Sequence, residues 1–354
     1  MRPLRRLMPA ALLAAATVLG ACSDSLSPED VDPEQLSANL DDVTTTFANN
    51  IAFQSLRQLS VSFPSYIAVA ALRATLPEAP RPGAWQGTAA ARLRQTRVYA
   101  SARAPGDILT LFPPDVLGKT FEWDVATHAY VAGTRTGAPA NGIRLLLYAV
   151  NPVTGTPVEA PLQELGSLDL TDESSPQADK LGIVLRLAQT VVADYDITGS
   201  FGITVASLGA QGYIQRPDGT GRITFNLQNT LNIAQGTLAL AYDINATDGT
   251  SIRIELSGND QQATLVFRVG RGGNTLEISG TETQTAVDAV IKYNGVVVAT
   301  VTGNPDDPTI AGANGHVVTE EELLALKHIV ERVADFLEDF VEGIFGPADV
   351  VFGL

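Results

Sequence analysis

Apolar and polar residues alternate along most of residues 180–303, and this alternation restricts the fold more than any other feature of the chain. Ile252, Ile254 and Leu256, for example, are separated by Arg253 and Glu255. Successive side chains of a β-strand point to opposite faces, so each such segment has one apolar and one polar face. The same period recurs at Ile223/Phe225/Leu227, Leu238/Leu240/Tyr242/Ile244 and Leu265/Phe267/Val269. The pattern predicts about ten strands, each with one face buried.

Turn residues separate these segments. They are Pro217-Asp218-Gly219, Asp248-Gly249, Gly258-Asn259-Asp260, Gly272-Gly273-Asn274 and Asn294-Gly295. Asp-Gly and Asn-Gly tolerate the positive φ of tight hairpins, so the strands are expected to follow one another in an antiparallel meander. Extended patterns at 121–125, 128–132 and 142–150 bring the predicted sheet region to residues 119–303.

Amphipathic helices are predicted on both sides of the sheet region. Residues 32–76 are read as helical, beginning at the cap Asp32-Pro33, with an apolar stripe at Leu36, Leu40, Val43, Phe47 and Ile51. A C-terminal helix at 319–345 begins at Thr319, where Glu322 completes a capping box. Leu323, Leu326, Val330, Val333, Leu337, Phe340 and Ile344 form its apolar seam.

The remaining segments are predicted to be loops. Residues 77–118 are rich in Pro and Arg, and residues 304–318 are acidic. The arginines between Arg73 and Arg103 fit a solvated loop, or alternatively a docking patch for a phosphate head group or an acidic partner. The chain is therefore predicted to be a single α+β domain over 32–354, mainly β, with its helices packed on the apolar face of a large curved sheet.

The N-terminus has the pattern of an export signal. Arg2, Arg5 and Arg6 precede an apolar run at 10–19 that is too short to span a bilayer as a helix. Leu19-Gly20-Ala21-Cys22 follows, and it resembles the lipobox of bacterial lipoproteins. The resemblance covers only this end of the chain. It implies a signal peptide at 1–21, acylation of Cys22 by palmitate or a similar chain, and a tether at 22–31.

Two other interpretations of this end stay open, namely an ordinary secretory signal and an uncleaved anchor. Ser23 stands where many inner-membrane lipoproteins have Asp, which favours an anchored position at the outer membrane of the cell envelope. Cys22 is the single cysteine of the chain, so a lipidated chain has no disulfide and depends on its core for stability.

The charge of the chain excludes some partners. The 354 residues include 23 basic and 39 acidic residues, and removal of 1–21 takes three of the basic ones, which leaves a net charge of −19. Binding to nucleic acid depends on Lys and Arg at phosphates, so nucleic acid is not an expected partner. Electrostatic attachment to anionic lipid is opposed as well, so the membrane is expected to be reached through the lipid on Cys22.

The predicted sheet has more apolar area than two helices cover. The sheet could therefore curl around the helices as a half-barrel or close into a barrel, residues 119–172 could form a second layer, or an apolar ligand could fill the gap. A curled antiparallel sheet covered by helices is similar in architecture to the half-barrel periplasmic lipoprotein carriers. That similarity implies a lipid or other hydrophobic ligand, although it comes from element order alone.

Sequence motifs for catalysis are lacking. His128, His316 and His328 have no partner nearby in sequence, and there is no G-x-S-x-G and no H-E-x-x-H. No catalytic residue, metal ligand or cofactor is therefore predicted. Paired carboxylates remain as an alternative, for a carbohydrate-active enzyme or a calcium site. The candidates are Asp194 and Asp196, then Asp169, Asp172 and Glu173, and then Asp306 and Asp307.

The sequence thus predicts a non-enzymatic, membrane-anchored lipoprotein of the bacterial cell envelope that holds a lipid or other hydrophobic ligand in a half-barrel. The alternative is a structural or partner-binding surface lipoprotein with a filled core. A carboxylate-based carbohydrate-active enzyme is the third interpretation.

Overall fold

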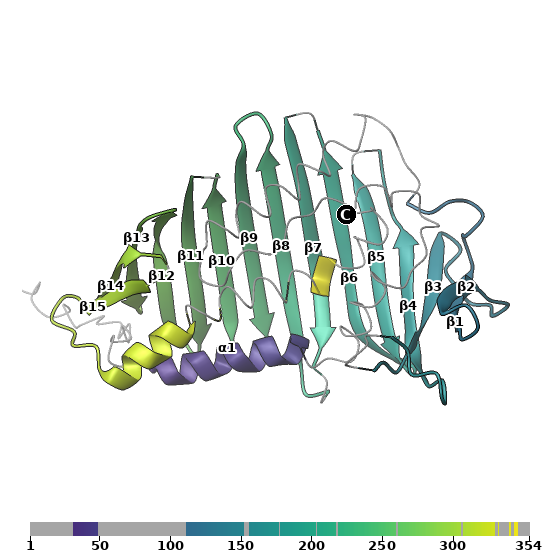
Figure 1. Ribbon diagram of the computed structural model, residues 1–354, viewed down its shortest axis with the longest axis horizontal. Helices are drawn as coiled ribbons and strands as arrows, with labels where there is room; N and C mark the ends of the chain where they lie inside the picture. The colour runs from purple at the N-terminus through teal and green to yellow at the C-terminus, as the bar shows by residue number, and fades with distance from the viewer. Residues whose placement is uncertain are drawn as a thin grey trace, which may run out of the picture.

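The computed structural model describes residues 31–48, 111–151, 156–176, 178–202, 204–216, 219–259, 261–305, 307–329, 332, 340 and 343–345. They form one open sheet of 15 strands (Figure 1). In chain order the strands are β1 (Thr120–Asp124), β2 (Ala129–Ala132), β3 (Gly142–Tyr148), β4 (Glu164–Asp172), β5 (Asp179–Leu187), β6 (Thr190–Phe201), β7 (Val205–Gln215), β8 (Arg222–Asn232), β9 (Thr237–Ala246), β10 (Ser251–Gly258), β11 (Gln262–Arg271), β12 (Asn274–Thr283), β13 (Val287–Tyr293), β14 (Val296–Asn304) and β15 (Asp307–Gly312).

The sheet is almost entirely an antiparallel meander. From β3 to β15 each strand pairs with the next one along the chain. The exception is at the other end, where β1 lies between β2 and β3 and pairs with β3 in parallel, with Phe121 opposite Leu145. The edges of the sheet are therefore β2 and β15.

The prediction of a mainly β fold with one antiparallel sheet is confirmed, and the predicted number of strands is wrong. Strands β5 to β14 correspond to the ten segments expected over 180–303, but β1 to β4 and β15 belong to the same sheet. The interpretation of 304–318 as an acidic loop is also wrong, because β15 lies within it. As an edge strand, β15 is largely exposed and needs no apolar alternation.

The hairpin predicted at Asn294-Gly295 is present between β13 and β14. Asn294 has a φ of 47° and Gly295 a φ of 84°, so both turn residues have the left-handed conformation that a tight hairpin requires. The Asn294 side chain also accepts a hydrogen bond of 2.9 Å from the backbone N–H of Thr275. This turn is thereby fixed to the neighbouring hairpin.

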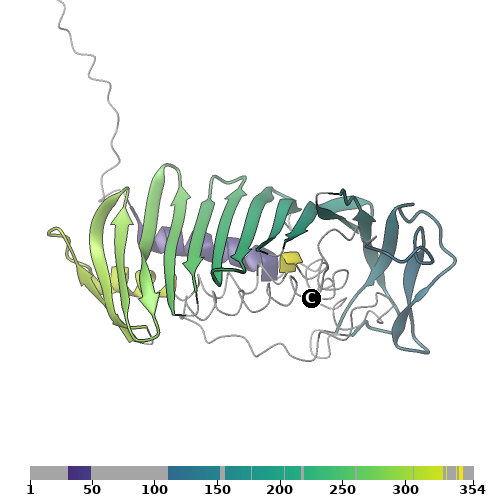
Figure 2. The same ribbon diagram turned by 90° about the horizontal axis from the view of Figure 1, so that it is seen from above.

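The two faces of the sheet differ sharply in burial. In β8, Ile223, Phe225 and Leu227 are buried while the intervening Thr224 and Asn226 are exposed. Buried side chains from strands β1 to β14 form one continuous core with those of the helices. Figure 2 shows that the sheet curves along its length, with the described helical segments on the inner side of the curve.

The N-terminal helix, α1 (Pro33–Ala48), begins where the sequence predicts. Asp32 caps it by accepting a 3.0 Å hydrogen bond from the N–H of Gln35. Leu36, Leu40 and Val43 are buried in the core. Figure 1 shows α1 lying across one end of several central strands. The rest of the predicted helical region, 49–76, lies outside the described residues, as do 1–30 with Cys22 and most of 77–118.

The C-terminal helix begins at the predicted capping box, and its described residues are 320–329, 332, 340 and 343–345. Thr319 Oγ1 accepts a 3.1 Å bond from the N–H of Glu322, and the Glu322 carboxylate accepts one of 3.3 Å from the N–H of Thr319. Glu322 also accepts hydrogen bonds from Tyr293 and from His316. No helix within the described residues is long and apolar enough to cross a membrane.

We expect the substitution Thr319→Ala to lower the free energy of unfolding by about 1 kcal/mol, the usual effect of removing an N-cap side chain. Chemical denaturation measures this change. The matched control is Thr302→Ala on the exposed polar face of β14, which should change stability by less than about 0.5 kcal/mol. Equal effects of the two substitutions would contradict the capping role.

Candidate functional site: the inner face and a polar cavity

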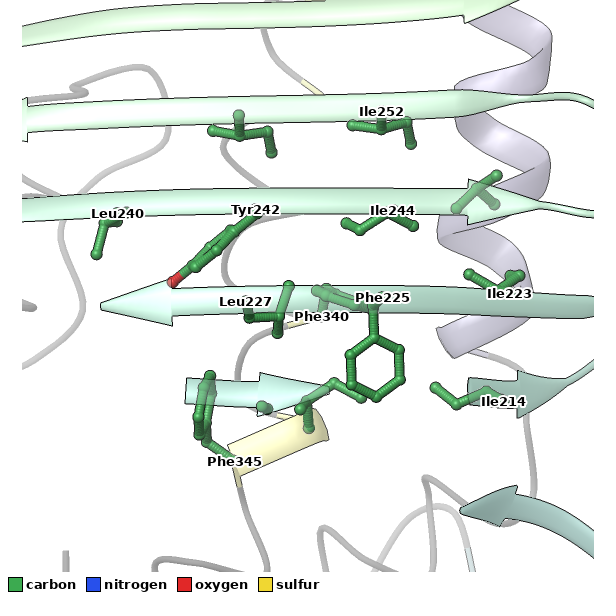
Figure 3. Close-up of a cluster of buried hydrophobic side chains, with 14 of the residues drawn as sticks. Ile214, Ile223, Phe225, Leu227, Leu240, Tyr242, Ile244, Ile252, Phe340 and Phe345 are labelled. Carbon is green, nitrogen blue, oxygen red and sulfur yellow. The ribbon is translucent and has the colours of Figure 1, made fainter. Parts of the chain in front are cut away.

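The inner face of the sheet is the position predicted for a hydrophobic ligand, and its described side chains are covered by the chain itself. Ile183, Ile197, Ile214, Leu227, Ile254 and Phe267 each have 0% of their surface exposed. Figure 3 shows part of this region, where side chains of neighbouring strands lie against Phe340 and Phe345 from the C-terminal segment. These described side chains therefore leave no accessible apolar surface for a ligand.

Three aromatic rings connect the sheet to the C-terminal segment. The ring of Phe225 packs edge-on against Tyr195, with a centroid distance of 5.6 Å, and against Phe340 at 5.8 Å. The Tyr195 hydroxyl donates a 3.1 Å hydrogen bond to the carbonyl of Ile344. Burial raises the pKa of Tyr195, which keeps this hydroxyl protonated as a donor. The sheet therefore contacts the C-terminal segment through both apolar ring packing and a hydrogen bond.

The predicted carboxylate candidates do not converge on one site. Asp194 is exposed, and Asp196 forms an ion pair with Lys180 at 3.0 Å. Glu173 pairs with the same lysine, while Asp172 accepts a bond from the N–H of Leu111. Asp307 is exposed in β15, and Asp306 lies outside the described residues. In the described part of the chain, no three His, Cys, Asp or Glu side chains are grouped so that they could hold a metal ion.

Each histidine contacts a carboxylate that is distant from it in sequence or helps to cap a helix. His128 lies 2.7 Å from Glu159, which also accepts a bond from the indole of Trp123. His316 contacts Glu322, and His328 reaches Asp41 of α1 at 3.0 Å. These pairs join structural elements. Within the described residues, the side-chain hydrogen bonds of the three histidines involve no serine, threonine or cysteine nucleophile.

A polar cavity of about 360 Å³, which sequence analysis did not predict, lies at the β1–β5 end of the sheet. Its walls come from β3 and β4, from the loop between β2 and β3, and from the tight turn between β5 and β6. Arg135, Arg144, Glu164, Ser167 and Gln189 line it. The cavity is partly open to solvent, and most of its lining groups are polar.

Asp169 fixes one wall of this cavity. Its carboxylate receives two hydrogen bonds from Arg144, of 2.6 and 2.8 Å, and one of 2.7 Å from Arg186. The Asp169 side chain is only 11% exposed. The hydrogen bond to Asp169 raises the pKa of Arg144, so this guanidinium stays charged. Charge-assisted bidentate contacts of this kind hold the guanidinium in one orientation.

The opposite wall is held by a second ion-pair group. Arg135 lies 2.6 Å from Glu164 and 3.5 Å from Glu122. Gly137, which has a φ of 100°, lets the loop between β2 and β3 approach closely, since a Cβ there would lie 3.3 Å from Nη1 of Arg144. The lining side chains are thus held in position by the fold.

The turn between β5 and β6 completes the cavity. Ala188 has a φ of 53°, a conformation that is uncommon for a residue with a Cβ. Its N–H donates a 2.9 Å hydrogen bond to the carbonyl of Leu165, which ties the turn to β4. Gln189, the next residue, is thereby placed at the mouth of the cavity.

We expect Asp169→Asn to destabilise the protein by about 2–3 kcal/mol, because two arginines would lose their shared carboxylate while remaining partly buried. Urea unfolding measures the loss. Asp194→Asn is the matched control, since Asp194 is exposed on β6, two strands away from Asp169. If both variants unfold at the same urea concentration, Asp169 does not hold the arginines as described.

No family model matches this chain, and no curated protein or solved structure is significantly similar to it. The fold and the cavity are therefore interpreted from their own residues.

Proposed function

We propose that the chain is a non-enzymatic lipoprotein of the bacterial cell envelope, anchored at the outer membrane through an acylated Cys22, and that its folded part is a structural or partner-binding scaffold with a filled core. One observation carries the choice of a filled core over a half-barrel carrier. The apolar side chains on the inner face of the sheet are covered by the chain without any ligand.

A carrier needs apolar space. Sites for small molecules have volumes of about 300–1,000 Å³, and side chains that line such a hollow remain accessible to a water-sized probe. Most of the described inner-face residues of β5 to β11 are closed to it, with exposed fractions at or near zero, while Leu208 of β7 is partly buried. The sheet curves around the described helical segments, as the curled form of the sheet requires (Figure 2).

The contacts of the predicted acids and histidines support a function other than catalysis. An acid–base catalyst needs a group that is free to exchange a proton with the substrate. In the described part of the chain, Asp169 is held by two arginines and Glu322 by a tyrosine and a histidine. The contacts of these two carboxylates stabilise the fold.

The outer face of the sheet supports a role as a binding surface. Asp243, Arg253, Arg268, Glu277 and Lys292 lie in one row across β9 to β13. Arg253 pairs with Asp243, while Arg268 and Lys292 both pair with Glu277. The row has three basic and two acidic side chains, so it offers a partner a hydrogen-bonding surface with a net charge of only +1.

Native mass spectrometry of the chain beginning at Ser23 tests the filled core. We expect the mass of the polypeptide alone, both after purification and after incubation with dodecanoic acid. The cavity-forming variant Leu227→Ala, incubated with benzene, is the positive control, because the apolar hole left by a Leu→Ala change can take up a guest of that size. A stoichiometric lipid on the unmodified chain would refute the filled core and favour the half-barrel carrier.

A further inference from the structure

The polar cavity at the β1–β5 end of the sheet has the features of a ligand-binding site, which the proposed scaffold role does not require. From its geometry we infer that it binds a neutral, hydroxyl-rich ligand of the size of one or two sugar units. The inference does not depend on the anchor at Cys22 or on the filled core. It rests on the balance of charge around the cavity and on the hydrogen-bonding groups left over inside it.

The charged groups around the cavity cancel. Three arginines, Arg135, Arg144 and Arg186, are joined by ion pairs to three carboxylates, Glu122, Glu164 and Asp169. A phosphate or carboxylate ligand would have to compete with a protein carboxylate for each guanidinium. A cationic ligand would meet the same competition at Glu164. The cavity therefore favours a ligand without net charge.

The lining nevertheless retains donors and acceptors. Within the described residues no hydrogen bond engages Nη1 of Arg144, Oε1 of Glu164, the Ser167 hydroxyl or the Gln189 amide. The first is a donor, the second an acceptor, and the other two are both. Sugar hydroxyls also donate and accept at once, so this mixed set matches a saccharide better than a ligand with one kind of polar group.

A buried hydroxyl adds a second, independent observation. Thr120, one of the residues that line the cavity, is 1% exposed, and its Oγ1 has no hydrogen-bond partner. Buried polar groups are rarely left without a partner, and those that are often mark the place of a water molecule or a ligand. The volume of about 360 Å³ is near the lower end of the range for small-molecule sites, about 300–1,000 Å³.

The side chains that line the cavity are also preorganised for binding. Its two arginine side chains are fixed by carboxylates, and the Ala188–Gln189 turn is bonded to β4. A ligand would therefore not have to order these groups, which lowers the free-energy cost of binding.

Saturation-transfer difference NMR on the full-length chain tests the inference, with maltose, cellobiose and chitobiose as probes at millimolar concentrations. The full-length chain is kept in solution with the detergent lauryldimethylamine oxide. This detergent has no sugar head group that could compete with the probes. We expect transfer to at least one disaccharide, and no competition by inorganic phosphate or citrate. Ser167→Leu, which fills the cavity, and Gln189→Ala should each weaken binding about tenfold, the effect of losing about 1.4 kcal/mol.

Ser257→Leu is the matched control, because Ser257 is exposed on the same polar face in β10, away from the cavity. It should leave binding unchanged. Gln189 is exposed in a turn, so its replacement keeps the test valid even if Ser167→Leu fails to fold. The inference is overturned if none of the three disaccharides shows transfer, if phosphate or citrate displaces them, or if Gln189→Ala binds as the unmodified chain does.

Discussion

Replacement of Cys22 by serine is expected to abolish incorporation of labelled fatty acid into the protein. A serine hydroxyl cannot form the thioether through which a lipobox cysteine is acylated, and the chain has no other cysteine. Metabolic labelling with palmitate, followed by gel fluorography, measures the effect. Ser23→Ala is the matched control and should be labelled fully. Continued labelling of the Cys22→Ser variant would refute the proposed anchor.

The charge of the chain gives this prediction a second readout. At a net charge of −19 after removal of 1–21, the domain is repelled by anionic lipid. Membrane attachment should therefore depend on acyl chains and should persist in high salt. Extraction of washed membranes with concentrated sodium chloride measures this dependence. Release of the labelled protein by salt would indicate attachment through charge.

Phe225→Ala is expected to cost about 3–5 kcal/mol of folding free energy, the usual loss for a large aromatic side chain that is removed from a core. Phe225 is 4% exposed and packs between Tyr195 and Phe340. Its loss should loosen the C-terminal segment from the sheet. Guanidinium unfolding followed by circular dichroism measures the change. Val205→Ala, at an exposed position of β7, should change stability by less than about 0.5 kcal/mol.

A double-mutant cycle separates the ring contact from simple burial. Phe225→Ala and Phe340→Ala should couple by about 0.5–1.5 kcal/mol, as edge-to-face aromatic pairs do. Additive effects of the two substitutions would mean that the C-terminal segment does not contact the sheet through these rings.

Local patterns were sufficient to predict most of the secondary structure. The strands of β5 to β14 each bury one face, so their alternation is visible in sequence, and the Asn294-Gly295 turn and the Thr319 cap depend on residues that are adjacent or three apart. Strand β15 was missed because an exposed edge strand buries neither face. The parallel pairing of β1 with β3 was not predicted, because the residues of β1 do not differ locally from those of a strand that pairs in an antiparallel hairpin.

The polar cavity could not be predicted for a similar reason. Arg144 and Asp169 are 25 residues apart, and Arg135 and Glu164 are 29 apart. Charged residues on exposed strand faces are common, and their pairing depends on strand register and on the path of the loop between β2 and β3. The register of β3 with β4, which sets Arg144 opposite Asp169, is a property of the folded sheet.

The order of the strands has a consequence for how the chain acquires its structure. From β4 onward each strand hydrogen-bonds to the one just before it, so the chain can add one hairpin arm at a time to a growing sheet. The first helix cannot join early, because Asn39 bonds to Arg271, 232 residues later. Until then α1 does not cover the inner face of the growing sheet, and this is the stage at which exposed apolar surface makes the chain most prone to aggregation.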